Sequence, residues 1–267
     1  MNFYKFLSFL ITICFTISCK QIEINETIQN TDASISTSTM DTSFDYFPTS
    51  TTNNIYEHKG YALSYVEEHE QAEWVAYYLE ESDFTSVKYE RPFFNQDPLV
   101  KTQSADWRNF KKTKYNKGHL CPAGDRKKSY ELYEETFYTS NASPQLYDFN
   151  AGIWNRFEQK TRYWAEKYDK LYVITGGVLS NDLKTIGTEK VAVPNYFYKI
   201  ILDYHTPELK VIAFLIPHEA SEKGLYQFVT SVDEIESLTG IDFFPELPDE
   251  LEAELEKSDS YLNWSLN

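Results

Sequence analysis

The segment 150–168 constrains the fold most, because a stripe of large apolar side chains runs along it. The stripe recurs at spacings of three and four residues, at Trp154, Phe157, Thr161, Trp164 and Tyr168. This period predicts an α-helix with one apolar face, which must be buried against a second layer. Residues 171–175 (LYVIT) follow as a predicted buried strand, stopped by Gly176 and Gly177.

Further strands and helices are predicted on both sides of this segment. Residues 60–66 read as a strand and residues 67–81 as a helix. The helix prediction rests on one apolar face, made of Ala72, Val75, Ala76 and Leu79. Residues 193–203 and 209–216 flank a turn, so they predict an antiparallel hairpin.

A short helix is predicted after Ser231, because Ser231 and Glu234 have capping-box spacing and Gly240 ends the segment. Along the whole chain, strands and helices mix without a regular alternation. This order favours an α+β fold over a doubly wound parallel sheet.

The N-terminus has the pattern of an export signal. In residues 1–18, Lys5 precedes an apolar run of 12 residues, 6–17, which is too short to span a bilayer. The ending TISC resembles the lipobox of bacterial lipoproteins, which implies cleavage before Cys19 and lipidation of Cys19. Thr16 stands where leucine is commonest, so a plain secretory signal stays open. Either way we expect the protein in the cell envelope, lipid-anchored or secreted, in the periplasm or outside the cell.

Residues 19–54 are predicted to be a disordered tether, because they are rich in Ser, Thr, Asn and Asp and lack apolar periodicity. The folded domain is then expected over residues 55–257, with a C-terminal tail at 258–267. We find no internal repeat.

The cysteines exclude an intrachain disulfide in the mature domain. Cys14 lies in the signal and Cys19 is the lipidation candidate, which leaves Cys121 alone. The fold must therefore rest on its apolar core, with or without a metal.

The charge of the chain is uneven. It has 41 Asp and Glu against 25 Lys and Arg, a net charge of -16, so its whole surface cannot bind polyanions. Yet residues 107–128, the basic segment, hold eight cations and one acid, Asp125. Such a strip suits a phosphodiester ligand. On charge alone a solvated loop is the more ordinary explanation, and a lone histidine such as His119 beside a turn is usually structural.

Polar residues also border the apolar stripe. Asn150 stands at the start of the predicted helix, and Glu158 and Arg162 lie on one edge of the stripe, where a core meets a cleft. Each has an ordinary alternative, which is a helix N-cap for Asn150 and an exposed i, i+4 pair for Glu158 and Arg162.

Three motifs together carry a family resemblance. KGHLCPAGD, followed by SNASPQLYDFNAGIW and FEQKTR, resembles the DNA/RNA non-specific endonucleases, which include endonuclease G and secreted bacterial nucleases. The resemblance spans about residues 56–251. It implies a ββα-metal (His-Me finger) fold, with a central, mostly antiparallel sheet flanked by helices. It also implies hydrolysis of phosphodiester bonds in DNA and RNA with Mg²⁺, or with Mn²⁺ or another divalent cation. Homodimers occur in this family, and the oligomeric state stays open.

The resemblance also implies roles for single residues. His119 matches the general base that deprotonates the attacking water, and Asn150 the direct protein ligand of the metal. Glu158 matches an acid that holds metal-bound waters. Arg162 matches a cation on the phosphate, and Asn141 a positioning residue.

Two further cations are expected at the phosphate by the same resemblance. Arg91 matches an upstream arginine of the family, and Lys117 takes the place of the arginine before the Gly-His pair.

These roles agree with elementary chemistry. An imidazole with a pKa of about 6.5 is available as a base near pH 7, and we expect neighbouring lysines to keep His119 neutral. One amide oxygen and several waters suit Mg²⁺, which dehydrates reluctantly. Since no group reads the bases, sequence specificity should be low.

The sequence departs from the family pattern at two places. Asn116 and Lys117 replace the usual Asp-Arg pair, so a bidentate fork becomes a point charge. Cys121 stands where alanine is common, which raises a Cys/His hydrolase as an alternative. Cys121 and His119 are only two positions apart on one predicted strand, which is a poor geometry for a nucleophile and its base. We therefore disfavour the Cys/His hydrolase.

Two functions of different classes follow from these patterns. The leading prediction is a metal-dependent, sugar-non-specific endonuclease of the cell envelope. The alternative is a non-catalytic envelope lipoprotein that binds nucleic acid and keeps only the nuclease fold.

Overall fold

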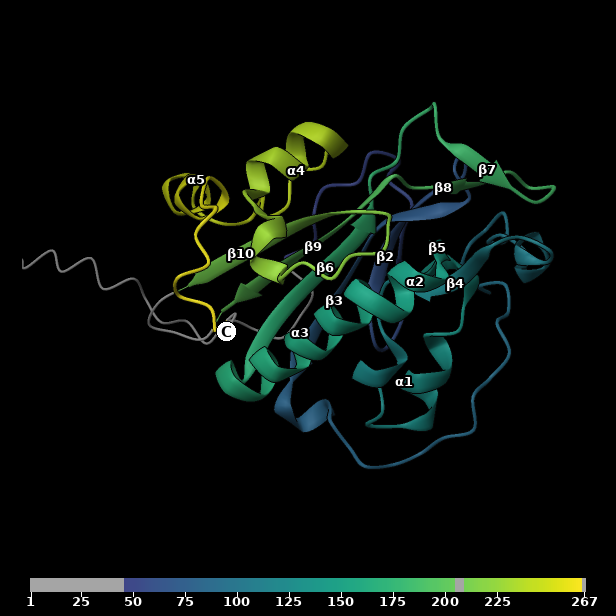
Figure 1. Ribbon diagram of the computed structural model, residues 1–267, viewed down its shortest axis with the longest axis horizontal. Helices are drawn as coiled ribbons and strands as arrows, with labels where there is room; N and C mark the ends of the chain where they lie inside the picture. Colours follow the sequence, from purple (N-terminus) through teal and green to yellow (C-terminus); the bar gives the residue numbers. More distant parts are fainter. Residues whose placement is uncertain (1–45, 205–208, 266–267) are drawn as a thin grey trace, which may run out of the picture. The chain divides into compact units, whose positions relative to one another are not determined.

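An antiparallel sheet of seven strands organises the protein, with the strand order β1-β2-β3-β6-β9-β10-β11 (Figure 1). The computed structural model describes residues 46–204 and 209–265, which all belong to one unit, Thr37–Asn267. The signal, Cys19 and most of the expected tether lie outside the described residues. The strands of the sheet are β1 (Ile55–Glu57), β2 (Ala62–Val66), β3 (Gln71–Glu80), β6 (Lys170–Gly177), β9 (Tyr196–Asp203), β10 (Lys210–Pro217) and β11 (Val229–Thr230).

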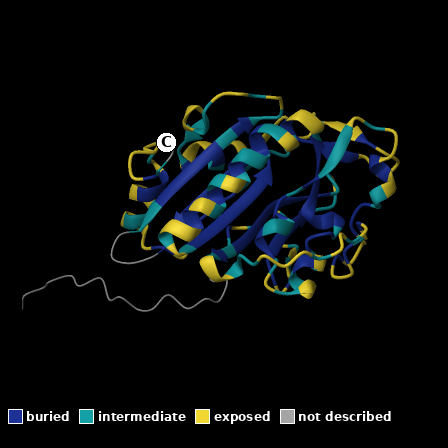
Figure 2. Ribbon diagram, turned by 60° about the horizontal axis from the view of Figure 1, so that its bottom comes forward, coloured by how far each residue is buried: buried dark blue, intermediate teal, exposed yellow. Residues whose placement is uncertain are grey.

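Helices cover both faces of this sheet. The long helix α3 (Asn155–Tyr168) packs on one face, against β3 and β6. The helices α4 (Val232–Thr239) and α5 (Asp249–Glu256) pack on the other face, against β10. Figure 2 shows the strands mostly in the colour of buried residues, whereas the helices show buried and exposed stretches in turn. The expected α+β fold, a mostly antiparallel sheet flanked by helices, is confirmed.

The double cover explains one wrong prediction. Residues 67–81 were expected to form a helix, but Gln71–Glu80 form β3, in the interior of the sheet. Seven consecutive residues of this strand, from Gln71 to Tyr77, are buried. A strand buried on both faces lacks the alternation of apolar and polar residues that identifies a strand. The spacing of Ala72, Val75, Ala76 and Leu79 then matches a helical period by chance.

The predicted strand at LYVIT is confirmed, but the two glycines continue it. The strand β6 ends at Gly177, and a Cβ atom at Gly176 would lie 2.2 Å from the carbonyl oxygen of Glu73 on β3. Gly176 is therefore needed for the close approach of two strands and does not terminate one.

Two other predictions are confirmed. The strands β9 and β10 pair antiparallel as the predicted hairpin requires, and residues 205–208 between them lie outside the described part of the chain. The helix α4 begins after Ser231, whose hydroxyl accepts a hydrogen bond from the Glu234 N–H at 3.1 Å, and it ends at Gly240 in the left-handed conformation.

A second, smaller unit of strands and helix lies on the α3 side of the sheet. The strand β4 (Tyr115–His119) pairs antiparallel with β5 (Ala142–Leu146). The chain then runs through α2 (Tyr147–Phe149) and a π-helical turn (Asn150–Trp154) into α3. These two strands and the helix form the ββα arrangement that the resemblance implied.

The remaining elements are short. The hairpin of β7 (Lys184–Ile186) and β8 (Val191–Val193) and the helix α1 (Tyr130–Glu135) complete the strands and α-helices. Single 3₁₀ turns occur at Glu81–Asp83, Trp107–Phe110, Ala123–Asp125, Thr139–Asn141 and Leu225–Phe228. No helix within the described residues is long and apolar enough to cross a bilayer.

Both ends of the described chain differ from the expected tether and tail. Residues 46–54, which we call the N-terminal strap, bind the domain. The Trp74 indole N–H donates to the Thr49 carbonyl at 2.9 Å, and Thr51 N–H donates to the Glu73 carboxylate at 2.9 Å. In the expected tail, Trp264 is only 4% exposed and packs against Trp164. The packed domain therefore includes residues on both sides of the range 55–257 that we expected from composition.

Candidate active site

His119 lies at the end of β4, with its ring between two phenylalanines. The ring centroids of Phe94 and Phe137 are 5.1 Å and 5.0 Å from the imidazole. The Nε2 atom is buried and has no hydrogen-bond partner among the described residues. Burial, and secondly the charge of Arg91, lower the pKa of His119 to about 3. The ring is therefore neutral at pH 7, chiefly because of burial. The cation that contributes to the lowered pKa is Arg91, whereas we had expected the neighbouring lysines to do so.

Five of the predicted site residues meet around one cavity of about 320 Å³. The cavity is lined by Arg91, His119, Asn150, Glu158 and Arg162, together with Pro122, Ala123, Gly124, Tyr133 and Phe137. These residues come from the loop before the basic segment, from β4 and the turn after it, and from the π-helical turn and α3. The ββα arrangement thus brings together residues that are up to 71 positions apart in the sequence.

Asn150 is the first residue of the π-helical turn. It has helical backbone angles, φ -63° and ψ -49°, and α2 precedes it, so it is not the N-cap that was its ordinary alternative. A π turn is often found at functional sites, since its wider ring redirects side chains that an α-helix would align.

Glu158 and Arg162 do not form an exposed pair with each other. The Arg162 guanidinium donates to Asp125 Oδ1 at 2.7 Å, and the Asp125 side chain is fully buried. Tyr77 donates its hydroxyl to the second oxygen of Asp125 at 3.1 Å. Asp125 therefore fixes Arg162 at the cavity wall.

Glu158 is a half-buried carboxyl group in the wall of the cavity. Burial, and then the negative charge of Asp125, raise the pKa of Glu158 to about 7, although Lys199 and Arg162 act in the opposite direction. A carboxyl group with such a pKa is partly protonated at neutral pH until a cation approaches it.

Sequence reasoning missed Lys199, which lies beneath the cavity. It is fully buried on β9, and its Nζ donates to the Thr175 hydroxyl at 2.7 Å. Burial lowers the pKa of Lys199 to about 8, while the carboxylate of Glu158 opposes this shift. The signal for it was present, since a lysine interrupts the apolar strand YFYKIILD.

Asn141, which we expected to be a positioning residue, does not line the cavity. It is fully buried, and its amide holds the backbone two residues after His119. The Oδ1 atom accepts from the Cys121 N–H at 2.7 Å, while Nδ2 donates to the carbonyls of Cys121 and Thr136, both at 2.9 Å. Asn141 therefore orients the chain that carries His119.

Cys121 is a buried core residue. It belongs to the apolar cluster beneath α3, and burial raises the pKa of its thiol to about 12. A thiol that stays protonated is a poor nucleophile, so the structure offers nothing for a Cys/His hydrolase.

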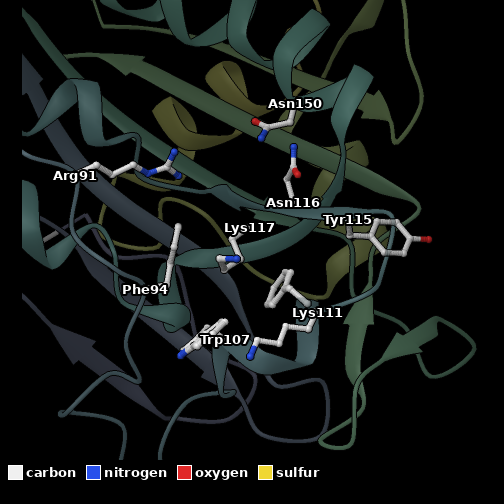
Figure 3. Close-up of a pocket in the computed structure, with 9 residues that line it drawn as sticks. Arg91, Phe94, Trp107, Lys111, Tyr115, Asn116, Lys117 and Asn150 are labelled. Carbon is white, nitrogen blue, oxygen red and sulfur yellow. The ribbon is translucent and has the colours of Figure 1, made fainter.

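A second cavity, also of about 320 Å³, adjoins the first and shares Arg91 and Asn150 with it. Figure 3 shows Asn116, Lys117, Phe94 and Trp107 around it. Its lining combines cations with aromatic rings, because Lys117 Nζ lies 5.3 Å from the Phe94 centroid and Lys111 Nζ lies 4.5 Å from that of Trp107. The residues that depart from the family pattern, Asn116 and Lys117, thus both face this cavity.

The oxygen donors of the first cavity fit a hard divalent cation. The Asn150 amide and the Glu158 carboxylate line the same space, and burial, followed by the negative charge of Asp125, raises the pKa of Glu158. Magnesium prefers such oxygen ligands and retains waters.

Comparison with known proteins yields a consistent group of relatives. The family model described as DNA/RNA non-specific endonuclease matches residues 41–250. The mitochondrial nuclease EXOG of Danio rerio is 34% identical over 204 residues, which is 70% of this chain and 60% of that protein. A nuclease of Nostoc sp. is 31% identical over 213 residues, which is 73% of this chain and 75% of that protein.

A solved structure shares the fold. It is a crystal structure of the EndoG/EndoGI complex, which superposes with a TM-score of 0.68 at 26% identity, over 74% of this chain and 88% of that chain. The chain spans only about 60% of the length of the EXOG relatives, which are longer proteins.

Proposed function

This chain belongs to the DNA/RNA non-specific endonuclease family, and from that premise we propose that it hydrolyses phosphodiester bonds in both DNA and RNA. One observation carries the proposal, which is the meeting of His119, Asn150, Glu158, Arg162 and Arg91 around a single cavity. The curated relatives named as nucleases support it. The alternative of a non-catalytic binding protein gains no support from them.

His119 acts as the general base in this proposal. Since Nε2 is closed off from solvent, the other ring nitrogen, Nδ1, takes the proton from the attacking water. A ring with a pKa of about 3 is a weak base. The negative charge of a bound phosphodiester offsets Arg91 and raises this pKa towards its usual range, so substrate binding itself prepares the base.

The two arginines hold the phosphate. Arg162 is fixed by Asp125, and its side chain remains 24% exposed at the cavity. Arg91 reaches both cavities. Guanidinium groups placed before the reaction stabilise the charge that grows on phosphorus in the transition state.

Asn150 and Glu158 are the residues that would hold a divalent cation, for which we propose Mg²⁺. Such an ion, when bound, stabilises negative charge on the phosphate and on the leaving oxygen. The charge of Lys199 opposes the protonation of Glu158 that burial favours, and Asp125 keeps Arg162 at the cavity wall.

The second cavity suits the nucleotide next to the cleaved bond. Its aromatic rings offer stacking surfaces to any base, and Lys111 and Lys117 offer charge to the neighbouring phosphate. Neither contact distinguishes base sequence.

We also propose export from the cytoplasm and an anchor at Cys19. The support is the sequence of residues 1–19 alone.

Digestion of supercoiled plasmid and of an RNA by the purified full-length chain tests the function. Wild type with Mg²⁺ should degrade both, while EDTA, His119→Ala and Asn150→Ala should each reduce the rate at least about 100-fold. His69→Ala and Asn181→Ala are matched controls outside the cavity and should keep full activity. If wild type leaves both substrates intact with Mg²⁺, Mn²⁺ and Ca²⁺, the proposal is wrong.

A further inference from the structure

Five carboxylates gather where α4, the loop after it and α5 meet. They are Asp233, Glu236, Asp242, Glu252 and Glu256. One oxygen each of Asp233, Glu236 and Glu256 lies within 4.8 Å of the others, and the same holds for Asp242, Glu252 and Glu256. Glu256 belongs to both groups, so it stands at the centre. In Figure 1 these helices lie on the face of the sheet opposite α3, away from the candidate active site.

Glu256 itself is buried and incompletely bonded. It is the last residue of α5, it is only 7% exposed, and its Oε1 atom has no hydrogen-bond partner within the described chain. A buried carboxylate oxygen without a partner is costly, and an unexplained one calls for a ligand. Burial, and then four neighbouring carboxylates, raise the pKa of Glu256 to about 8.

Protein cations do not balance this cluster. Among the described residues, 46–204 and 209–265, none of the five acids forms an ion pair with a Lys, Arg or His side chain. One oxygen of Glu236 accepts from the Phe243 N–H at 2.9 Å, which still leaves its charge uncompensated. A bound cation would supply the positive charge that this arrangement lacks.

The number of oxygen donors favours calcium, and their spacing is compatible with it. Calcium takes six to eight oxygen ligands at about 2.3–2.6 Å in flexible geometry, so two of its ligands lie at most about 5 Å apart. Both groups of three fall within that limit. Magnesium demands a tighter octahedron and keeps most of its waters.

We propose that Glu256 binds a calcium ion together with Asp233 and Glu236 of α4, Asp242 of the loop and Glu252 of α5. The ion joins three segments of the C-terminal layer. The site is also linked to the N-terminal strap through Asp242. The Thr49 N–H donates to the Asp242 carbonyl at 2.7 Å, and the Asp242 N–H donates to the Thr49 hydroxyl at 2.8 Å. The role of the ion is therefore structural, and it is independent of the proposed nuclease reaction.

Calorimetric titration of the metal-free, full-length chain with CaCl₂ tests the site. The titration uses Asn150→Ala as background, so that the candidate active site does not contribute. We expect Ca²⁺ to bind and to raise the thermal midpoint. Glu256→Gln should weaken Ca²⁺ binding about tenfold or more. Glu254→Gln removes the same charge from an exposed position of α5 and should leave the affinity unchanged.

Asp233→Asn is a second variant, chosen because Asp233 is exposed and its replacement does not disturb the core. It should also weaken Ca²⁺ binding, while plasmid cleavage with Mg²⁺ in the otherwise wild-type chain stays intact. The proposal is overturned if Ca²⁺ produces neither heat nor a higher midpoint, or if Glu256→Gln and Glu254→Gln bind Ca²⁺ alike. Equal affinity for MgCl₂ would overturn the choice of calcium.

Discussion

At the scale of single residues, burial keeps the His119 imidazole neutral and makes the stability of the fold depend on pH. Its pKa of about 3 lies below the usual value of about 6.5. Between these two pH values the unfolded chain binds a proton that the folded chain does not. The free energy of unfolding therefore falls as the pH falls through this window.

We predict that wild type loses more stability between pH 7 and pH 5 than His119→Ala does. The difference should be about 2 kcal/mol, from 1.36 kcal/mol for each of about 1.5 pH units. Urea denaturation at both pH values measures it, with His69→Ala as the control that behaves like wild type. Equal losses in wild type and His119→Ala would show that the imidazole titrates normally.

The site residues named from the sequence came from the family motifs, and their ordinary alternatives could be rejected only in three dimensions. Asn150 could have been an N-cap until α2 was seen to precede it. The interactions of Asp125 and Lys199 with Glu158 could not be predicted, because nothing in the local sequence links these residues to Glu158. Their positions follow from the packing of α3 on the sheet.

At the scale of elements, sequence patterns identified most of the core elements and failed at one strand that is buried on both faces. The helix α3 and the hairpin of β9 and β10 were predicted correctly. The strand β3 was not, because its burial on both sides removes the alternation that identifies a strand. The π-helical turn at Asn150 was also beyond prediction, since it shares the apolar period of the helix that follows it.

The approach of β3 and β6 at Gly176 gives a test at this scale. Gly176→Ala places a Cβ atom 2.2 Å from the Glu73 carbonyl oxygen, so the two central strands must separate. We expect the free energy of unfolding to fall by about 3 kcal/mol, as measured by urea denaturation. A loss below about 0.5 kcal/mol would mean that the strands adjust freely.

At the scale of the whole molecule, the N-terminal strap adds to the stability of the domain. It covers Trp74, whose ring lies 5.9 Å from that of Phe47, and it binds Glu73 and Asp242. A chain that begins at Ile55 should be less stable than one that begins at Thr37 by at least about 2 kcal/mol, because several buried hydrogen bonds are lost. Thermal denaturation of the two chains compares them, and equal midpoints would show that the strap contributes nothing.

The strap also determines where a mechanical load enters the protein. Tyr46 and Phe47 pack in the apolar cluster of the α4 and α5 face, whereas the cavity with His119 lies on the α3 side. If Cys19 holds the protein to a surface, tension along the chain acts first on the packing of Tyr46 and Phe47, and then on Thr49 and its bonds to Trp74 and Asp242. The seven-stranded sheet stands between the strap and the cavity with His119, so a pull on the strap would reach that cavity only through the sheet.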